Sequence, residues 1–240
     1  MDKQELLKFL DRPEIKGLIA ENDLEAVYQE LEYKDRSKLS EYLFSLGINP
    51  LQYFYRSIPG HAFKGCEKLT QVEFGNTIFK IGDDCFMNCV NLSGVVLPDN
   101  ILFIGDSIFS HCENLIDVSI GKGLKRVSYS AFQDCDKLSS VELGDNIEFI
   151  GPRAFLRCNG LVSIKLPDSC TSIGYGAFAE CKNLTSITIP AGVDRIGSEA
   201  FKDCDNLSDV NYGGTPEQWH EIEIYNYNEP LINANIHFKN

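Results

Sequence analysis

The chain carries the stretch IGYGAFAECKNLTSITIPAGVDR at residues 173–195, and this stretch predicts the fold. Its pattern recurs every 23 residues between Ile58 and about Val210, in seven copies without an insertion or a deletion. A repeat of fixed length is typical of solenoids, because one copy cannot enclose its own apolar side chains whereas stacked copies can. We therefore predict that the copies stack on one another.

A short strand is predicted near the end of each copy. Ile187 and Ile189 lie two residues apart and point to one face of such a strand, while Ser186 and Thr188 point outward. Pro190 ends the strand because proline has no backbone N–H to donate. Every copy has Gly or Pro at this position.

The motif Ala-Phe-x-x-Cys follows a second short apolar segment, and its spacing predicts one turn of helix with Phe and Cys inward. Its cysteines stand 23 residues apart, which is not the CxxC spacing of a metal site. Stacked strands hold equivalent Cβ atoms ~4.8 Å apart, whereas a disulfide prefers ~3.8 Å, so we expect buried unpaired thiols. The cysteines of this column are Cys66, Cys89, Cys112, Cys135, Cys158, Cys181 and Cys204.

The full pattern I-G-x-x-A-F-x-x-C-x-x-L-x-x-[VI]-x-[LI]-P resembles the BspA-like leucine-rich repeat, also called the Treponema pallidum type. The tail at residues 212–222 is similar to the closing element of that family. The resemblance implies a right-handed curved solenoid with a parallel sheet on its concave side, and recognition of proteins or surfaces without catalysis. The departures from the pattern include Cys85 and Ile108 in place of Ala, Ser128 in place of Gly, and Cys170 in place of an aliphatic residue.

Three parts are expected along the chain: a helical module at 1–57, the seven repeats at 58–210, and a capping element at 211–240. The first part is either a cap on the exposed end of the solenoid or a separate binding module, and both interpretations stay open. Its helices are expected to start at Asp2, at Asp11 with Pro13, at Asn22 or Asp23, at Ser37, and at Asn49 with Pro50.

The composition excludes several classes of function. There are 35 acidic and 22 basic residues, a net charge of −13, which argues against sequence-independent nucleic-acid binding and against docking on an anionic membrane. No apolar run approaches the ~18–20 residues of a membrane span. The N-terminus has no signal-peptide core, so we expect a cytoplasmic protein.

The sequence shows no chemistry that would mark an enzyme. The four histidines fall in four different contexts, and His61 and His111 are expected at exposed, variable positions of their copies. There is no phosphate-binding loop, no dinucleotide motif and no metal-ligand pattern. We predict no catalytic residue, no metal and no cofactor.

Function should therefore lie on surfaces, and two are candidates. The concave face is polar and mildly acidic, and it would accept a basic partner by charge complementarity through Glu73, Asp117, Glu142, Lys165 and Asp209. The second surface carries the apolar column Phe79, Leu102, Phe103 and Phe149. Either the N-terminal helices cover this column, or it binds a partner or a second copy of the chain.

Three functional hypotheses follow. The first is a non-catalytic protein-protein interaction module. The second is an acidic inhibitor that blocks a nucleic-acid-binding enzyme, based on the net charge of −13 and the lack of a secretion signal. The short helical leader before the repeats also resembles proteins carried by bacteriophages. The third, surface adhesion, is weakened by the missing signal and by thiols that an oxidising compartment would endanger.

Overall fold

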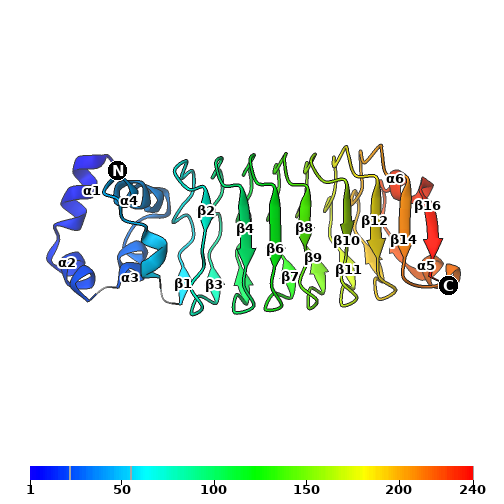
Figure 1. Ribbon diagram of the computed structural model, residues 1–240, viewed down its shortest axis with the longest axis horizontal. Helices are drawn as coiled ribbons and strands as arrows, with labels where there is room; N and C mark the ends of the chain where they lie inside the picture. The colour runs from blue at the N-terminus through cyan, green and yellow to red at the C-terminus, as the bar shows by residue number, and fades with distance from the viewer. Residues whose placement is uncertain (22, 55, 240) are drawn as a thin grey trace.

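The computed structural model describes residues 1–21, 23–54 and 56–239, and it shows a rod of stacked turns with helices at its N-terminal end (Figure 1). Each turn contributes one long and one short strand, and strands of one kind pair in parallel with the equivalent strands of neighbouring turns. This confirms the predicted leucine-rich-repeat solenoid with a parallel sheet and a helical N-terminal region.

The long-strand sheet consists of the strands that carry the motif Val/Ile-x-apolar, which face the viewer in Figure 1. This sheet is interrupted between Ser140–Glu142 and Ser163–Lys165, which are not hydrogen-bonded to each other. On either side of the interruption the register is a shift of 23 residues, as in Val95 opposite Val118, up to the last strand, where Val210 lies opposite Ile236. The strands are β2 (Gln71–Val72), β4 (Gly94–Leu97), β6 (Asp117–Ile120), β8 (Ser140–Glu142), β10 (Ser163–Lys165), β12 (Ser186–Ile189), β14 (Asp209–Tyr212) and β16 (Asn235–Phe238).

The short-strand sheet lies along another side of the rod and is formed by two-residue strands that end in the aliphatic column of the repeat. Its strands are β1 (Ser57–Ile58), β3 (Lys80–Ile81), β5 (Phe103–Ile104), β7 (Arg126–Val127), β9 (Phe149–Ile150), β11 (Ser172–Ile173), β13 (Arg195–Ile196) and β15 (Glu223–Ile224). The C-terminal tail adds the short helices α5 (Pro216–Glu221) and α6 (Glu229–Asn233).

The N-terminal helices are α1 (Lys3–Leu10), α2 (Pro13–Ala20), α3 (Leu24–Gln29) and α4 (Tyr33–Ser45), followed by the 3-10 turn η1 (Pro50–Tyr53). Asp2, Asp23 and Asn49 accept the backbone N–H bonds expected of them, whereas Asn22 lies outside the described residues.

Two expected helix starts are wrong. Arg12 rather than Asp11 precedes α2. Helix α4 begins at Tyr33, four residues before Ser37, without a side-chain cap. Contacts with residues distant in sequence stabilise the first turn of α4. Asp35 binds the N-terminal amino group at 2.7 Å, and Arg36 donates to the Gly60 carbonyl at 3.1 Å.

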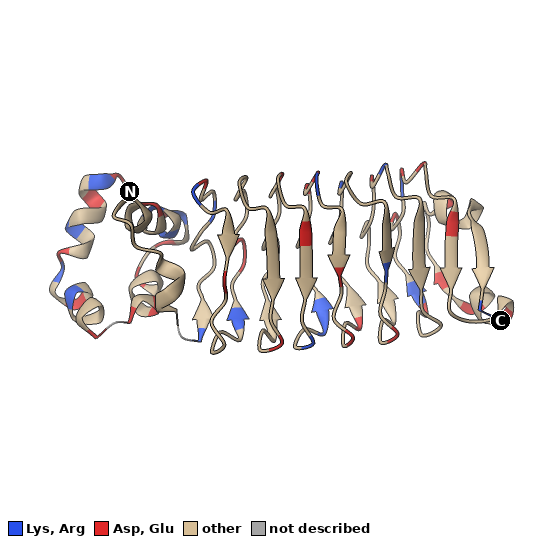
Figure 2. Cartoon of the chain, in the orientation of Figure 1, with Lys and Arg blue, Asp and Glu red and all other residues tan. Residues whose placement is uncertain are grey.

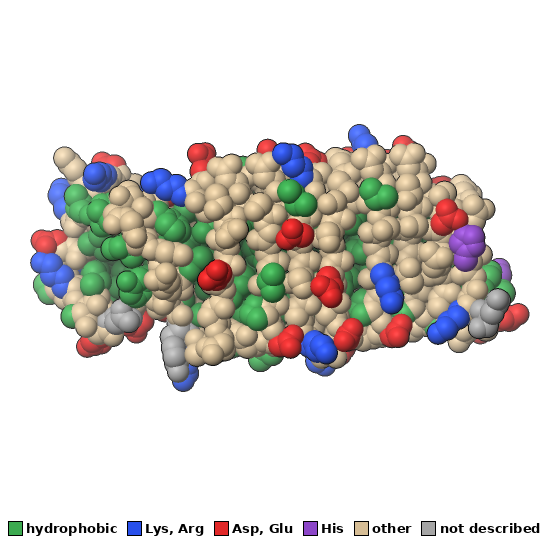
Figure 3. Space-filling view, viewed as in Figure 1, with side chains coloured by type: hydrophobic (Ala, Val, Ile, Leu, Met, Phe, Trp, Pro, Cys, Tyr) green, Lys and Arg blue, Asp and Glu red, His purple; other side chains and the backbone are tan. Residues whose placement is uncertain are grey.

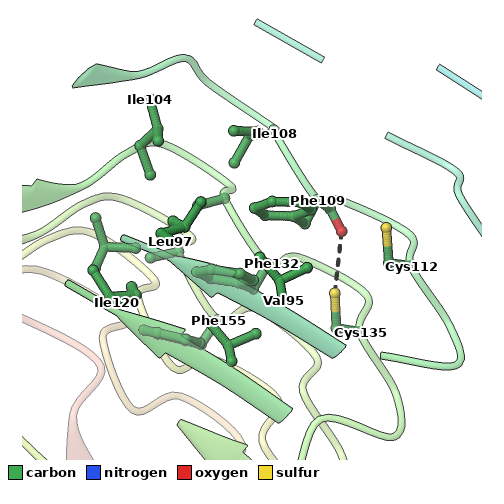
Figure 4. Close-up of a cluster of buried hydrophobic side chains, with 14 of the residues drawn as sticks. Val95, Leu97, Ile104, Ile108, Phe109, Cys112, Ile120, Phe132, Cys135 and Phe155 are labelled. Atoms are coloured by element: carbon green, nitrogen blue, oxygen red, sulfur yellow. Dashed lines mark hydrogen bonds between the residues drawn. The ribbon is translucent and has the colours of Figure 1, made fainter. Parts of the chain in front are cut away.

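A column of seven stacked phenylalanine rings runs through the core of the rod, and each is fully buried. Neighbouring ring centroids are 5.3–5.6 Å apart and the rings are tilted by no more than 16°. Figure 4 shows three of these rings, Phe109, Phe132 and Phe155. The column consists of Phe63, Phe86, Phe109, Phe132, Phe155, Phe178 and Phe201.

The cysteine column holds each copy to the one before it. The Cys135 thiol donates to the carbonyl oxygen of Phe109 in the preceding copy at 3.2 Å, the bond drawn in Figure 4, and the other cysteines from Cys89 to Cys204 repeat this bond. All nine cysteines are buried and unpaired. Burial raises the pKa of the Cys66 and Cys204 thiols to about 12, which disfavours a reactive thiolate.

The Ala-Phe-x-x-Cys segment forms tight turns, and the predicted helical turn is wrong. The N–H groups of Phe132 and Asp134 donate to the carbonyls of Ala154 and Leu156 in the next copy, at 2.8 and 2.9 Å. Ser130 and Asp134 have φ angles of 49° and 59°. The backbone adopts this left-handed geometry because bonds between copies replace the i to i−4 bonds of a helix.

Aromatic side chains from the N-terminal segment cover the first ring of the column. Phe54 meets Phe63 edge-on with centroids 6.1 Å apart, and Phe44 lies 6.3 Å from the same ring. At the other end, the buried Asn228 accepts a hydrogen bond from the Phe201 N–H at 3.0 Å. Both ends of the column are therefore shielded from water, as a stacked array requires.

Replacing one ring of the column should destabilise the fold far more than replacing an exposed ring. We predict that Phe132→Ala lowers the free energy of unfolding by about 3–5 kcal/mol, since it leaves a cavity in a fully packed stack. The matched control Phe103→Ala, at a ring 60% exposed, should stay within about 0.5 kcal/mol. Urea denaturation measures both, and equal effects would contradict the role assigned to the column.

Candidate functional site

Metal-binding clusters and membrane-spanning helices are two kinds of site that can be checked in the described part of the chain. No group of three His, Cys, Asp or Glu side chains there is placed to hold a metal ion. None of the described helices is both long and apolar enough to cross a membrane.

The expectation of exposed histidines is wrong for His61 and His111, which are partly buried. They occupy left-handed turn positions, with their Nε2 atoms 3.7 and 3.5 Å from Asp84 and Asp134. The ring of His61 also lies 5.1 Å from that of Tyr33. Burial lowers the pKa of His61, so its neutral form is favoured.

The long-strand sheet presents the charged residues expected on the concave face (Figure 3). Glu73 follows β2, and Asp117, Glu142 and Lys165 lie on β6, β8 and β10; all four are exposed. Asp209 is half-buried and accepts hydrogen bonds from Ser208 at 2.6 Å and His237 at 2.7 Å, which lower the pKa of its carboxyl group. This face also exposes Val96, Ile116 and Val162, of which only Val96 stood at an expected outward position.

A groove along the short-strand sheet gathers three of the four residues of the apolar column. Phe79, Leu102 and Phe103 line it with 39%, 48% and 60% of their surface exposed. The groove has a volume of about 1250 Å³ and extends from α3 and α4 to β7. Phe149 is half-buried on β9 and does not line it.

The N-terminal helices reach this groove but leave its apolar residues uncovered. Gln29, Tyr33 and Arg36 form one end of it. Arg36 is 5% exposed and lies 4.4 Å above the ring of Tyr33. No signal in the sequence marks these three residues, because only the packing of the helices against the first copy brings them to the groove.

An interruption of the short-strand sheet lies within the groove. Among the described residues, β1, β3 and β5 form one sheet and β7 belongs to another. Elsewhere the glycine after the short strand donates its N–H to the preceding copy, as Gly105 does to Ile81 at 2.8 Å. A Cβ on Gly105 would lie 2.3 Å from the Asp83 nitrogen, so this approach requires glycine.

Ser128 occupies the glycine position at the interruption. Its Oγ, rather than its N–H, donates to the Ile104 carbonyl at 2.7 Å. The hydroxyl thus replaces a backbone bond between the copies, while β5 and β7 stay unpaired. The sequence had identified Ser128 as a departure from the pattern, but its effect on pairing depends on how closely the backbones approach.

Four basic side chains line the groove against two carboxylates. Lys80, Lys125, Arg126 and Arg36 are the basic ones, and Asp83 and Asp106 are the acidic ones. Lys125 is 2.9 Å from Glu148, whereas Lys80 and Arg126 form no ion pair with any described residue. The groove is therefore locally basic on a chain whose net charge is −13.

The hydroxyl of Ser128 should be required where the glycine N–H is not available. We predict that Ser128→Ala lowers the free energy of unfolding by about 1–3 kcal/mol, because it leaves the Ile104 carbonyl without its donor. Ser128→Gly should cost less, since a glycine N–H can make the bond seen in other copies. Thermal melting of the two variants tests this order, and the reverse order would refute the role of the hydroxyl.

Comparison with known proteins places these features in a family. The description of the BspA type leucine rich repeat region fits residues 48–162 and 125–239. A leucine-rich repeat protein from Bacteroides ovatus is 27% identical with a TM-score of 0.60, over 77% of this chain and 52% of that chain. This chain thus spans about half the length of that protein.

Two further solved structures are similar over shorter or more divergent stretches. The leucine-rich repeat protein of T. pallidum is 28% identical over 59% of this chain and 61% of its own, with a TM-score of 0.44. A leucine rich cell surface protein of Faecalibacterium prausnitzii is 22% identical over 76% of this chain and 65% of its own, with a TM-score of 0.39.

No curated protein matches the chain. The repeats of the matching family are generally non-catalytic. Together, the uniform 23-residue register, the stacked Phe and Cys columns and the match over residues 48–239 show that this chain belongs to the BspA-type leucine-rich repeat family.

Proposed function

We propose that the chain is a non-catalytic protein-binding module and that it holds its partner in the groove. The observation that supports this is the grouping of Phe79, Leu102 and Phe103, which stay exposed although helices pack beside them. Contiguous exposed apolar side chains bordered by polar ones are typical of interaction sites.

The composition and size of the groove favour a protein partner. Aromatic and Arg side chains dominate the binding energy of protein interfaces, and this groove contains Phe79, Phe103, Tyr33 and Arg126. Its volume of about 1250 Å³ exceeds the ~300–1000 Å³ of ordinary small-molecule sites. Because stacked copies fix the positions of these side chains, binding requires little ordering of the groove.

A second candidate function uses the other face. The acidic inhibitor would place Glu73, Asp117 and Glu142 against the basic surface of a nucleic-acid-binding enzyme. The exposure of all three carboxylates on one face supports this function.

In either proposal we assign the chain to the cytoplasm, a choice supported by its nine unpaired thiols. Surface adhesion stays the third hypothesis, without an observation on the site that favours it.

Two sets of substitutions separate these functions. We predict that Phe79→Ser with Phe103→Ser weakens the Kd of the partner by at least about 30-fold, since large interface side chains each contribute more than ~1–2 kcal/mol. The partner is recovered by affinity purification from the source cell, identified by mass spectrometry and titrated as a purified protein. The control Val96→Ser with Val162→Ser removes equally exposed apolar residues from the long-strand sheet and should change the Kd less than about twofold.

Reversing the charges on the long-strand sheet tests the inhibitor function and can contradict the proposed role of the groove. If Glu73→Lys, Asp117→Lys and Glu142→Lys together abolish binding while the groove variant still binds, the inhibitor function replaces the groove. Competition of that partner with DNA or RNA, weakened by moderate salt, would then identify its basic surface. Phe149→Ser should leave the Kd unchanged, because Phe149 does not line the groove.

A further inference from the structure

We propose that the groove binds an extended segment of the partner protein in which Asp or Glu residues flank a large apolar side chain. This inference rests on the proposed function and adds the chemistry and the conformation of the bound segment. Three features of the groove support it: its charges, the buried guanidinium of Arg36 and the missing pairing between β5 and β7.

The charges of the groove favour an acidic segment. Lys80 on β3 and Arg126 on β7 are exposed and form no ion pair within the described chain, and Figure 2 shows blue at both strands. Of the two carboxylates in the groove, Asp83 already accepts a hydrogen bond from the Asp106 N–H at 2.9 Å. A segment with acidic residues would therefore gain charge complementarity that this chain does not supply itself.

Arg36 places a buried positive charge at the helical end of the groove. Its guanidinium donates to the carbonyls of Leu31 and Gly60 at 3.3 and 3.1 Å, and to the Gln29 amide oxygen at 3.0 Å. All three acceptors are uncharged, and a guanidinium has five N–H donors. Burial lowers the pKa of Arg36. A carboxylate from a bound segment would compensate its charge.

The apolar side chains lie between the positive charges. Leu102 and Phe103, just before and at the start of β5, separate Lys80 on β3 from Arg126 on β7. An apolar residue of the segment would pack on these side chains while acidic residues on either side reach the cations. This order of charges gives the pattern acidic–apolar–acidic.

The missing backbone pairing between β5 and β7 favours a bound segment with an extended backbone over a helical one. The Leu102 N–H donates to the Phe79 carbonyl at 2.8 Å, and the Glu148 N–H donates to the Lys125 carbonyl at 2.7 Å. In the described structure no such bond joins the Lys125 N–H to the Leu102 carbonyl. The two copies stay in contact here, since the Ser128 Oγ lies 2.7 Å from the Ile104 oxygen, so the segment lies across the strands and not between them. An extended segment in that position keeps N–H and C=O groups free to bond the Lys125 N–H or the Leu102 carbonyl, whereas a helix uses its own internally.

The length of the groove limits the segment. Between β1 and β7 lie three strand intervals of ~4.8 Å, roughly 14 Å in all, which about four extended residues span at ~3.3 Å each. The helical end at Tyr33 and Arg36 adds room for one or two more. A short linear motif is therefore sufficient to fill the site.

Selection from a random heptapeptide display library tests this proposal with the full chain. We expect the selected peptides to be enriched in Asp and Glu around Phe, Leu, Ile, Tyr or Trp. A synthetic peptide of the consensus should lose at least about tenfold in affinity with Lys80→Glu plus Arg126→Glu, and with Phe103→Ser. Raising the salt concentration from 50 to 500 mM should weaken it as well.

The control variant is Lys137→Glu plus Lys182→Glu, which reverses the same charge at exposed positions outside the groove. It should leave the affinity of the consensus peptide within about twofold. Cooperative melting of each variant establishes that it is folded before its affinity is compared.

Three results would overturn the proposal: no enrichment, enrichment of basic or uncharged peptides, or affinity that does not respond to Lys80→Glu plus Arg126→Glu. Binding of a 15-nucleotide oligo-dT in the groove would also overturn it, since aromatic and basic side chains can hold single strands. If the purified partner depends on Phe79 and Phe103 while acidic peptides do not bind, only this inference fails. If the partner is indifferent to the groove, the proposed function fails as well.

Discussion

The stacking of equivalent side chains at equal intervals is the constraint on which the rest of the structure depends. Each of the five inner phenylalanines of the core column has a ring on either side 5.3–5.6 Å away, and each cysteine of the column from Cys89 onward donates its thiol hydrogen to the preceding copy. These contacts are repeated only if every copy has the same length, since a shift of one residue would turn strand side chains to the opposite face. The uniform 23-residue spacing of the sequence is the result.

The sequence predicts the features that this periodicity controls. The inward Phe, Cys, Leu and Ile columns, the unpaired thiols and the parallel pairing all follow from spacing and residue type. The Ala-Phe-x-x-Cys turn does not, because a spacing of three or four residues is shared by a helix and by turns bonded to the next copy, as at Phe132 and Asp134. The start of α4 was also missed, because contacts of Asp35 and Arg36 distant in sequence, rather than a capping residue, fix it.

The candidate site arises where the pairing of the short strands is interrupted. Phe79, Leu102 and Phe103 were identifiable from their outward positions, and the structure brings them together in one groove. Phe149, which belongs to the same column, is separated from them by Lys125 and Arg126. Whether the N-terminal helices cover the apolar residues depends on how those helices pack, and the sequence alone left it open. The groove therefore combines a local departure, Ser128, with tertiary contacts of α3 and α4.

Deletion of one complete copy tests the stacking account most directly. Removal of residues 150–172 takes out 23 residues and joins Phe149 to Ile173, which restores the register of both sheets and leaves the groove intact. Removal of residues 150–161 takes out 12 and destroys that register. The account predicts a single cooperative urea transition with a smaller m-value for the first protein, and loss of cooperative unfolding for the second. Equally cooperative unfolding of both proteins, or of the second alone, would contradict it.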